Sequence, residues 1–155
     1  KRILSNEMNN NYDIPVYSAN VKEPFGKINK LLIDDFTKGS ILWGIDGDWM
    51  VNYIPANTPF YPTDHCGVLR VDETKMNPHF VMFMLEMAGK QAAFNRSNRA
   101  SIDRIKSLTI PNIPLDVQNM AMTEVEEYET IINEAKARMN LCIEQKKVIL
   151  DKYLR

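Results

Sequence analysis

The sequence predicts an α+β fold, in which a small, twisted, mostly antiparallel β domain with short helices is followed by a long C-terminal coiled-coil helix. Between residues 12 and 70, short apolar runs alternate with Pro, Gly, Asn and Asp, as is typical of short strands joined by turns. From Leu115 to the end there is neither Gly nor Pro, which allows one helix of about 40 residues. We therefore expect two segments, residues 1–114 and 115–155.

Apolar runs bounded by turn residues predict the strands of the first segment. The expected strands are Ile14–Tyr17, Lys30–Ile33, Ser40–Trp43, Trp49–Tyr53 and Cys66–Val71. Gly47 lies in a tight connection between two of them, where a positive φ is often needed. Trp43 and Trp49 are expected in the core.

A helix is expected next, because Asn77 is a suitable N-cap and Pro78 suits the first helical position. The apolar spacing continues to Gly89. A basic loop at residues 90–100 and a short turn capped by Ser101 and ending near Lys106 should follow. Pro111 and Pro114 then close the first segment.

The last segment carries apolar residues in a regular alternation of four and three, which predicts a coiled-coil seam of over four heptads. A helix of this length extends roughly 60 Å and needs a partner helix to cover the seam. The seam positions are Ala121, Val125, Tyr128, Ile132, Ala135, Met139, Cys142, Lys146, Ile149 and Tyr153. Lys146, the one charged member, could set the register of the pair.

Composition excludes several classes of protein. The 155 residues carry 19 Lys and Arg against 20 Asp and Glu, and no run approaches the roughly 18 apolar residues of a membrane span. We therefore expect a cytoplasmic chain that needs no cofactor. Cys66 and Cys142 lack a CxxC spacing, so both are expected as free thiols in packed positions. No initiator Met precedes Lys1, so we expect the sequence to begin inside a longer or tagged chain, with an upstream partner domain outside it.

The net charge of −1 hides an uneven distribution. Residues 89–106 hold five basic residues and one acidic residue, a local charge of +4, whereas residues 111–155 hold six basic and eight acidic residues, a local charge of −2. Nucleic-acid binding depends on basic surface. Any DNA footprint should therefore lie in the first segment.

Five stretches match one known family in order and spacing. They are Tyr12–Tyr17, Ser40–Gly44 followed by Gly47, the Asn77-Pro78 helix as far as Leu85, Arg99–Ile105, and Ile110–Gln118. With them the chain resembles the specificity subunit of type I restriction-modification systems over nearly its whole length. It departs from the family pattern at Asp48-Trp49 and at Asn112-Ile113-Pro114.

The resemblance implies a non-catalytic component of the restriction-modification complex. The first segment would be a target recognition domain that reads one half of a split target in double-stranded DNA. The long helix would be a spacer that packs antiparallel against another such helix, from a second copy or from elsewhere in a longer chain. It would also dock methyltransferase subunits, in a complex that includes restriction subunits.

Three groups of residues in the first segment have the chemistry for DNA contacts. Arg pairs with guanine and Asn with adenine, and Asp accepts from cytosine, while Lys neutralises phosphate. The candidates are Lys90, Asn95, Arg96, Ser97, Asn98 and Arg99 in the basic loop; Lys22, Lys27 and Lys30 near a turn; and Asp46, Asp48, Asn52 and Tyr53 in a hairpin. The alternative is structural: a solvated loop whose Asn and Ser cap the next turn, and a plain polar hairpin tip.

Two other classes remain as alternatives. Asp64 followed by Glu73-Thr74-Lys75 has the residue order of a PD-(D/E)xK nuclease, although the triplet runs straight into the expected helix start. The long helix could also be a protein-interaction scaffold that the β part merely caps. His65, Cys66 and His79 lack a zinc-ligand spacing, so no metal site is expected.

Overall fold

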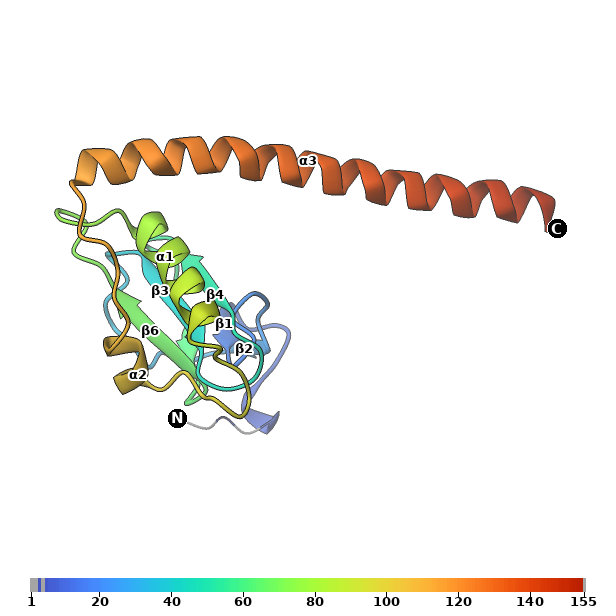
Figure 1. Cartoon of the computed structure of the whole chain (residues 1–155). Helices are drawn as coiled ribbons and strands as arrows, with labels where there is room; N and C mark the ends of the chain where they lie inside the picture. The colour runs from blue at the N-terminus through green and yellow to red at the C-terminus, as the bar shows by residue number, and fades with distance from the viewer. Residues whose placement is uncertain (1–2, 4, 155) are drawn as a thin grey trace. The chain divides into compact units, whose positions relative to one another are not determined.

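A computed structural model describes residue 3 and residues 5–154. The outermost residues of the two predicted segments, 1, 2 and 155, and residue 4 lie outside the described residues. The chain divides into two compact units, Lys1–Gln118 and Asn119–Arg155. Figure 1 shows a mixed β and helical first unit and a single long helix that forms the second.

The first unit contains two three-stranded sheets. In one sheet, β1 (Ile14–Tyr17) lies between β2 (Gly26–Ile28) and β5 (Tyr61–Pro62); in the other, β3 (Ser40–Gly44) lies between β4 (Val51–Ile54) and β6 (Cys66–Arg70). The β1–β5 pair is parallel and the other three pairs are antiparallel. The predicted class, a small and mostly antiparallel β domain with short helices and a long helix after it, is confirmed.

β3 is the central strand of the second sheet and is buried along its whole length. Because successive side chains of a strand point to opposite faces, Trp43 packs in one apolar cluster with helix α1 (Pro78–Gln91), which contributes Leu85, while Leu42 packs in another with Phe60. The expected placement of Trp43 in the core is confirmed. Trp49 is half-buried, and its ring nitrogen donates to the backbone oxygen of Glu86, 2.9 Å away.

The two short helices begin where the sequence predicted. The side chain of Asn77 accepts from the backbone N–H groups of His79 and Phe80, at 2.8 and 3.1 Å, so the expected N-cap of α1 is confirmed. α2 (Ile102–Lys106) begins after Ser101, but the Ser101 side chain makes no cap hydrogen bond, so that expected cap is wrong. Its backbone oxygen accepts from Ile105 instead, as in an ordinary helical turn.

One expected strand is wrong. Residues 30–33 form no strand, and β2 lies earlier, where Ile28 is buried beside Val16 of β1 and Tyr61 of β5. The adjacent Leu31 and Leu32 are both exposed, and the chain bends at Leu32 instead of continuing as a strand. β5 was not predicted either, because it has only two residues and pairs with a strand far away in the chain.

The first turn of α3 (Leu115–Tyr153) belongs to the first unit and is held there by Gln118. The Gln118 side chain is fully buried. Its oxygen accepts from the backbone N–H of Asn77 at 2.9 Å, and its nitrogen donates to the backbone oxygen of Ile113 at 2.7 Å. One side chain therefore joins the segment before α3 to the start of α1.

Candidate nucleic-acid interface

The candidate site is assembled around the residue that follows β3. The backbone N–H of Ile45 donates to the oxygen of His65 at 3.0 Å, and its oxygen accepts from the N–H of Ala100 at 2.9 Å. The ring nitrogen of Trp43 holds Ala100 as well, with a 2.9 Å bond to its backbone oxygen. These bonds bring the turn before β6 and the end of the basic loop together at the β3 end of the same hairpin.

Asp46 therefore lies between His65 and Arg99. The Nδ1 atom of His65 is 2.9 Å from both carboxylate oxygens of Asp46. Because a carboxylate only accepts, Nδ1 carries the hydrogen of this contact. The Nη2 atom of Arg99 lies 3.4 Å from Oδ2 of the same carboxylate. The three side chains form one polar cluster at the tip of the hairpin, and His65 and Arg99 are exposed.

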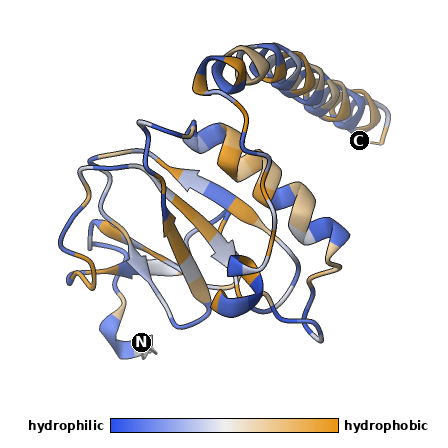
Figure 2. Ribbon diagram, turned by 60° about the vertical axis from the view of Figure 1, so that its left-hand side comes forward, coloured by the Kyte–Doolittle hydropathy of each residue, from blue (hydrophilic) through white to orange (hydrophobic). Residues whose placement is uncertain are grey.

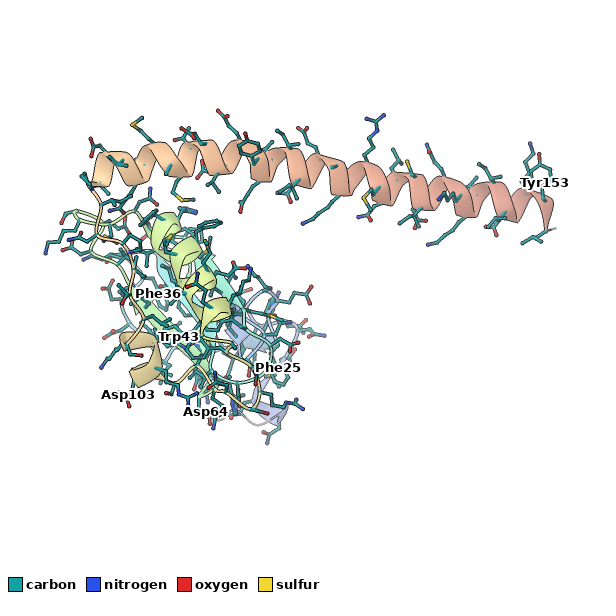
Figure 3. The ribbon with its side chains drawn as sticks, viewed as in Figure 1. Phe25, Phe36, Trp43, Asp64, Asp103 and Tyr153 are labelled. Carbon is teal, nitrogen blue, oxygen red and sulfur yellow. The ribbon has the colours of Figure 1, made fainter. Side chains whose placement is uncertain are left out.

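An open hollow of about 370 Å³ lies beside this cluster. Two of the lining residues are the basic-loop residues Arg96 and Arg99, which come together here with the hairpin. The lining is Ser18, Ala19, Asp46, Gly47, His65, Arg96 and Arg99. Figure 3 labels Asp64, the neighbour of His65, toward the same end of the unit as Asp103 of α2.

Two glycines allow the hollow to form. Gly47 has a φ of +96°, so the positive φ expected in this connection is confirmed. Gly44 lies so close to the segment after β1 that a Cβ atom would be 2.3 Å from the backbone oxygen of Ala19. A larger residue at position 44 would displace Ala19, which lines the hollow.

The asparagines of the basic loop are occupied within the loop. The Asn95 side chain accepts from the backbone N–H groups of Ser97 and Asn98, at 2.8 and 2.9 Å. The Asn98 side chain donates to the oxygens of Ala92 and Ala93 and accepts from Arg104. These bonds shape the loop itself, and Arg96 and Arg99 stay exposed.

The lysines predicted near the first turn do not gather at the hollow. Lys30 forms an ion pair with Glu7 and lines a separate depression with Tyr12. Hydrogen bonding and the charge of Glu7 raise the pKa of Lys30. Lys22 and Lys27 are exposed, and Lys90 pairs with Glu86 one helical turn earlier in α1.

The structure also separates the predicted hairpin residues from one another. Asp48 is exposed, whereas Asn52 donates to the backbone oxygen of Val21 at 2.7 Å. The Tyr53 ring packs on the His79 ring with 4.5 Å between centroids. Burial, then the charge of Glu73, raises the pKa of Tyr53. Asn52 and Tyr53 thus support the fold rather than the hollow.

His65, Ser18 and Ala19 line the hollow but were not among the predicted contact residues. By sequence, His65 is a candidate only for metal binding, and its place in a polar turn, Thr63-Asp64-His65, is the one local signal that indicates exposure. Ser18 accepts from the hydroxyl of Thr63 at 3.2 Å, so the two segments are tied together. No local pattern indicates this contact, because it joins residues 45 positions apart.

The residues considered for other chemistry lie in ordinary structural settings. Glu73, Thr74 and Lys75 form the turn between β6 and α1. Within the described part of the chain, no group of three or more His, Cys, Asp or Glu side chains is placed to hold a metal. Cys66 is buried, as expected, and burial raises the pKa of its thiol to about 12.

The seam of α3 is open to solvent in the single chain. Every residue described after Val125 is exposed, including the seam positions from Tyr128 to Tyr153. Cys142 is among them, so its expected packed position is wrong for the chain by itself. Figure 2 shows hydrophobic and hydrophilic residues alternating around this helix. Among the described residues, no helix is long and apolar enough to cross a membrane.

Comparison with known proteins identifies the family. Residues 1–144 match the type I restriction modification DNA specificity domain. The chain belongs to this family, which is non-catalytic. The match covers both the hollow-bearing unit and most of α3, in agreement with the resemblance read from the sequence.

The similar proteins come from Mycoplasma pneumoniae (strain ATCC 29342 / M129 / Subtype 1). The chain is 26% identical over 147 residues to the type I restriction enzyme MpnII specificity subunit, covering 94% of this chain and 44% of that protein. Two further proteins of this organism, also named as type I specificity subunits, are 26% identical over 133 and 147 residues, which is 84% and 94% of this chain. The chain spans 36% and 58% of their lengths. No solved structure matches the chain.

Proposed function

We propose that the chain recognises double-stranded DNA for a type I restriction-modification complex and reads one half of a bipartite target. The observation that carries this proposal is the hollow in which Arg96 and Arg99 of the basic loop meet the Asp46–Gly47 hairpin tip. Its cationic side chains can neutralise phosphates, and its polar groups can reach base edges. Membership of the DNA specificity domain family supports the same reading.

In this proposal the long helix holds recognition domains at a fixed separation. Its apolar seam would pack antiparallel against a second spacer helix, either of another copy or of a longer chain, and the paired helices would dock methyltransferase subunits. The exposed side chains of Tyr128, Ile132 and Ile149 support a pairing role, because an uncovered seam of this length is unfavourable in water. Methylation and cleavage would then belong to partner subunits.

The test is selection from a randomised duplex library at two salt concentrations, with and without a methyltransferase subunit. We expect enrichment of a short motif, and binding that weakens as salt rises because counterions are released from neutralised phosphates. If no duplex is retained at either salt concentration, even with the subunit present, DNA recognition is wrong and the helix is the functional part, as in the scaffold alternative.

Paired variants locate the site. Replacing Arg96 and Arg99 together by Ala should weaken target binding and reduce its dependence on salt. Replacing Lys147 and Lys152 of α3 by Ala removes the same charge from the second unit and serves as the matched control. If target binding weakened equally in the two double variants, the placement of the interface at the hollow would be wrong.

A further inference from the structure

We propose that Arg99 is the specificity-determining residue of the hollow, that it reads a guanine base, and that Asp46 and His65 are positioning residues that orient it. The inference rests on the proposed function and assigns different roles to the two arginines of the basic loop. Arg96 is assigned a phosphate contact, which carries no sequence information.

The first step is the difference between the surroundings of the two arginines. The guanidinium of Arg99 approaches the Asp46 carboxylate, with 3.4 Å between Nη2 and Oδ2. Arg96 is exposed at the turn of the loop and forms no ion pair or side-chain hydrogen bond within the described part of the chain. A planar guanidinium that is held in one direction can form paired hydrogen bonds to guanine O6 and N7. A guanidinium without such a partner can follow the phosphates of the DNA backbone.

The second step is that the Asp46 carboxylate is itself held. The Nδ1 atom of His65 approaches both of its oxygens at 2.9 Å, while Arg99 approaches one of them at 3.4 Å. A carboxylate near DNA lowers the affinity because it repels the phosphates. We therefore expect Asp46 to have a role in recognition that offsets this repulsion. Because its oxygens already serve two side chains, we assign Asp46 the orientation of Arg99 rather than the cytosine contact expected from the sequence.

The third step is that the backbone of Arg99 is fixed as well. Arg104 donates to the backbone oxygen of Arg99 at 3.2 Å, and the next residue, Ala100, is bonded to both Ile45 and Trp43. The loop therefore ends at a fixed point beside the hairpin. A side chain that starts from a fixed backbone and meets a fixed carboxylate loses little conformational freedom when it binds a base.

The first experiment compares Arg99→Lys with Arg96→Lys in the full chain. Both variants keep the positive charge but replace the planar, forked guanidinium by a single ammonium group. Affinity is measured for the selected target and for duplexes in which each base pair is changed in turn. Arg99→Lys should lose about ten- to hundredfold discrimination at one G·C pair. Arg96→Lys should change the affinity for the target and the affinity for each altered duplex by the same factor.

The second experiment tests the positioning residues. Asp46→Ala should lose discrimination at that same G·C pair, while its binding to unrelated duplex stays equal or becomes tighter because a negative charge is removed. His65→Val should lose discrimination too, and His65→Asn should restore part of it, because an amide N–H can stand near the position of Nδ1. Both residues lie at the surface, and thermal unfolding of each variant checks that the fold is kept.

Distinct outcomes overturn the inference and the proposed function. Equal losses of discrimination in Arg99→Lys and Arg96→Lys would contradict the assignment of Arg99. Tighter binding of Asp46→Ala to target and altered duplexes alike, with discrimination unchanged, would show that Asp46 only repels DNA. A wild-type chain that binds all duplexes equally or none would instead contradict the proposed function itself.

Discussion

At the scale of single residues, Gln118 has the clearest structural role. Its fully buried amide satisfies the backbone N–H of Asn77 and the backbone oxygen of Ile113. Those two groups are part-buried and would lose this hydrogen bond if the side chain were shortened. An unsatisfied buried polar group costs more than a hydrogen bond contributes when it is made.

Gln118→Ala should therefore lower the free energy of unfolding of the first unit by about 2 to 4 kcal/mol, since two backbone groups lose their partner. Chemical denaturation followed by tryptophan fluorescence measures this, because Trp43 and Trp49 both lie in that unit. Gln145→Ala is the matched control: it removes the same side chain from an exposed position of α3. A loss no larger than that of the control would contradict the role of Gln118.

The buried thiol of Cys66 gives a prediction about pH. Burial raises its pKa from 9.0 to about 12, so the unfolded chain releases this proton at lower pH than the folded chain does. The contribution to stability is complete below pH 9 and declines as the pH rises from 9 toward 12. Cys66→Ala should flatten the decline in unfolding free energy over this range. An unchanged profile in the variant would show that other groups cause the decline.

At the scale of elements, local sequence patterns predict most of the helices and strands. The strands that could not be predicted are those that form only by pairing with distant residues. The capped α1, the uninterrupted α3 and the strands β1, β3, β4 and β6 have their signals in neighbouring residues, so the sequence predicts them. β2 and β5 depend on pairing with β1, which no local pattern encodes. The apolar pair Leu31-Leu32 suggested a strand that had no partner to pair with.

The seam of α3 makes an element-scale prediction. Ile132→Asp should abolish self-association measured by sedimentation, because a buried charge in the seam is unfavourable, while leaving the first unit folded. Leu141→Asp introduces the same charge at an exposed apolar residue outside the seam and should leave association intact. Loss of association in both variants, or in neither, would show that the heptad alignment is wrong.

Cys142 provides an independent check of the same seam. Its thiol is exposed in the single chain, so it should react readily with a thiol reagent at low protein concentration. If the seam pairs, its rate of modification should fall as protein concentration rises, and Ile132→Asp should remove this dependence. A rate that stays constant across concentrations would mean that Cys142 lies outside the interface.

At the scale of the whole molecule, the candidate site could be predicted only in part. Asp46, Arg96 and Arg99 were found by their chemistry, each within its own loop. Their meeting at one hollow depends on the bonds of Ile45 to His65 and to Ala100, which join residues far apart in sequence. His65 was missed for the same reason, and the roles of Asn95 and Asn98 within the loop required the folded geometry.

The two units together predict how targets are arranged. If paired spacer helices separate two recognition domains, library selection with the wild-type chain should enrich two copies of a motif at one fixed spacing. Ile132→Asp should still enrich a single motif and lose the fixed spacing. Retention of the spacing by this variant would show that something other than the seam sets the distance.

The position of Gln118 has a consequence for chimeric proteins. A graft of the first unit onto a foreign helix would be cut at Pro114 if the boundary predicted from the sequence were used. With such a junction, position 118 would be filled by a residue of the foreign helix. The backbone N–H of Asn77 at the start of α1 would keep a partner only if that residue could accept its hydrogen bond. A junction after Gln118 transfers this side chain together with Asn77 and Ile113. The transplanted unit then keeps both hydrogen bonds that join the segment before α3 to the start of α1.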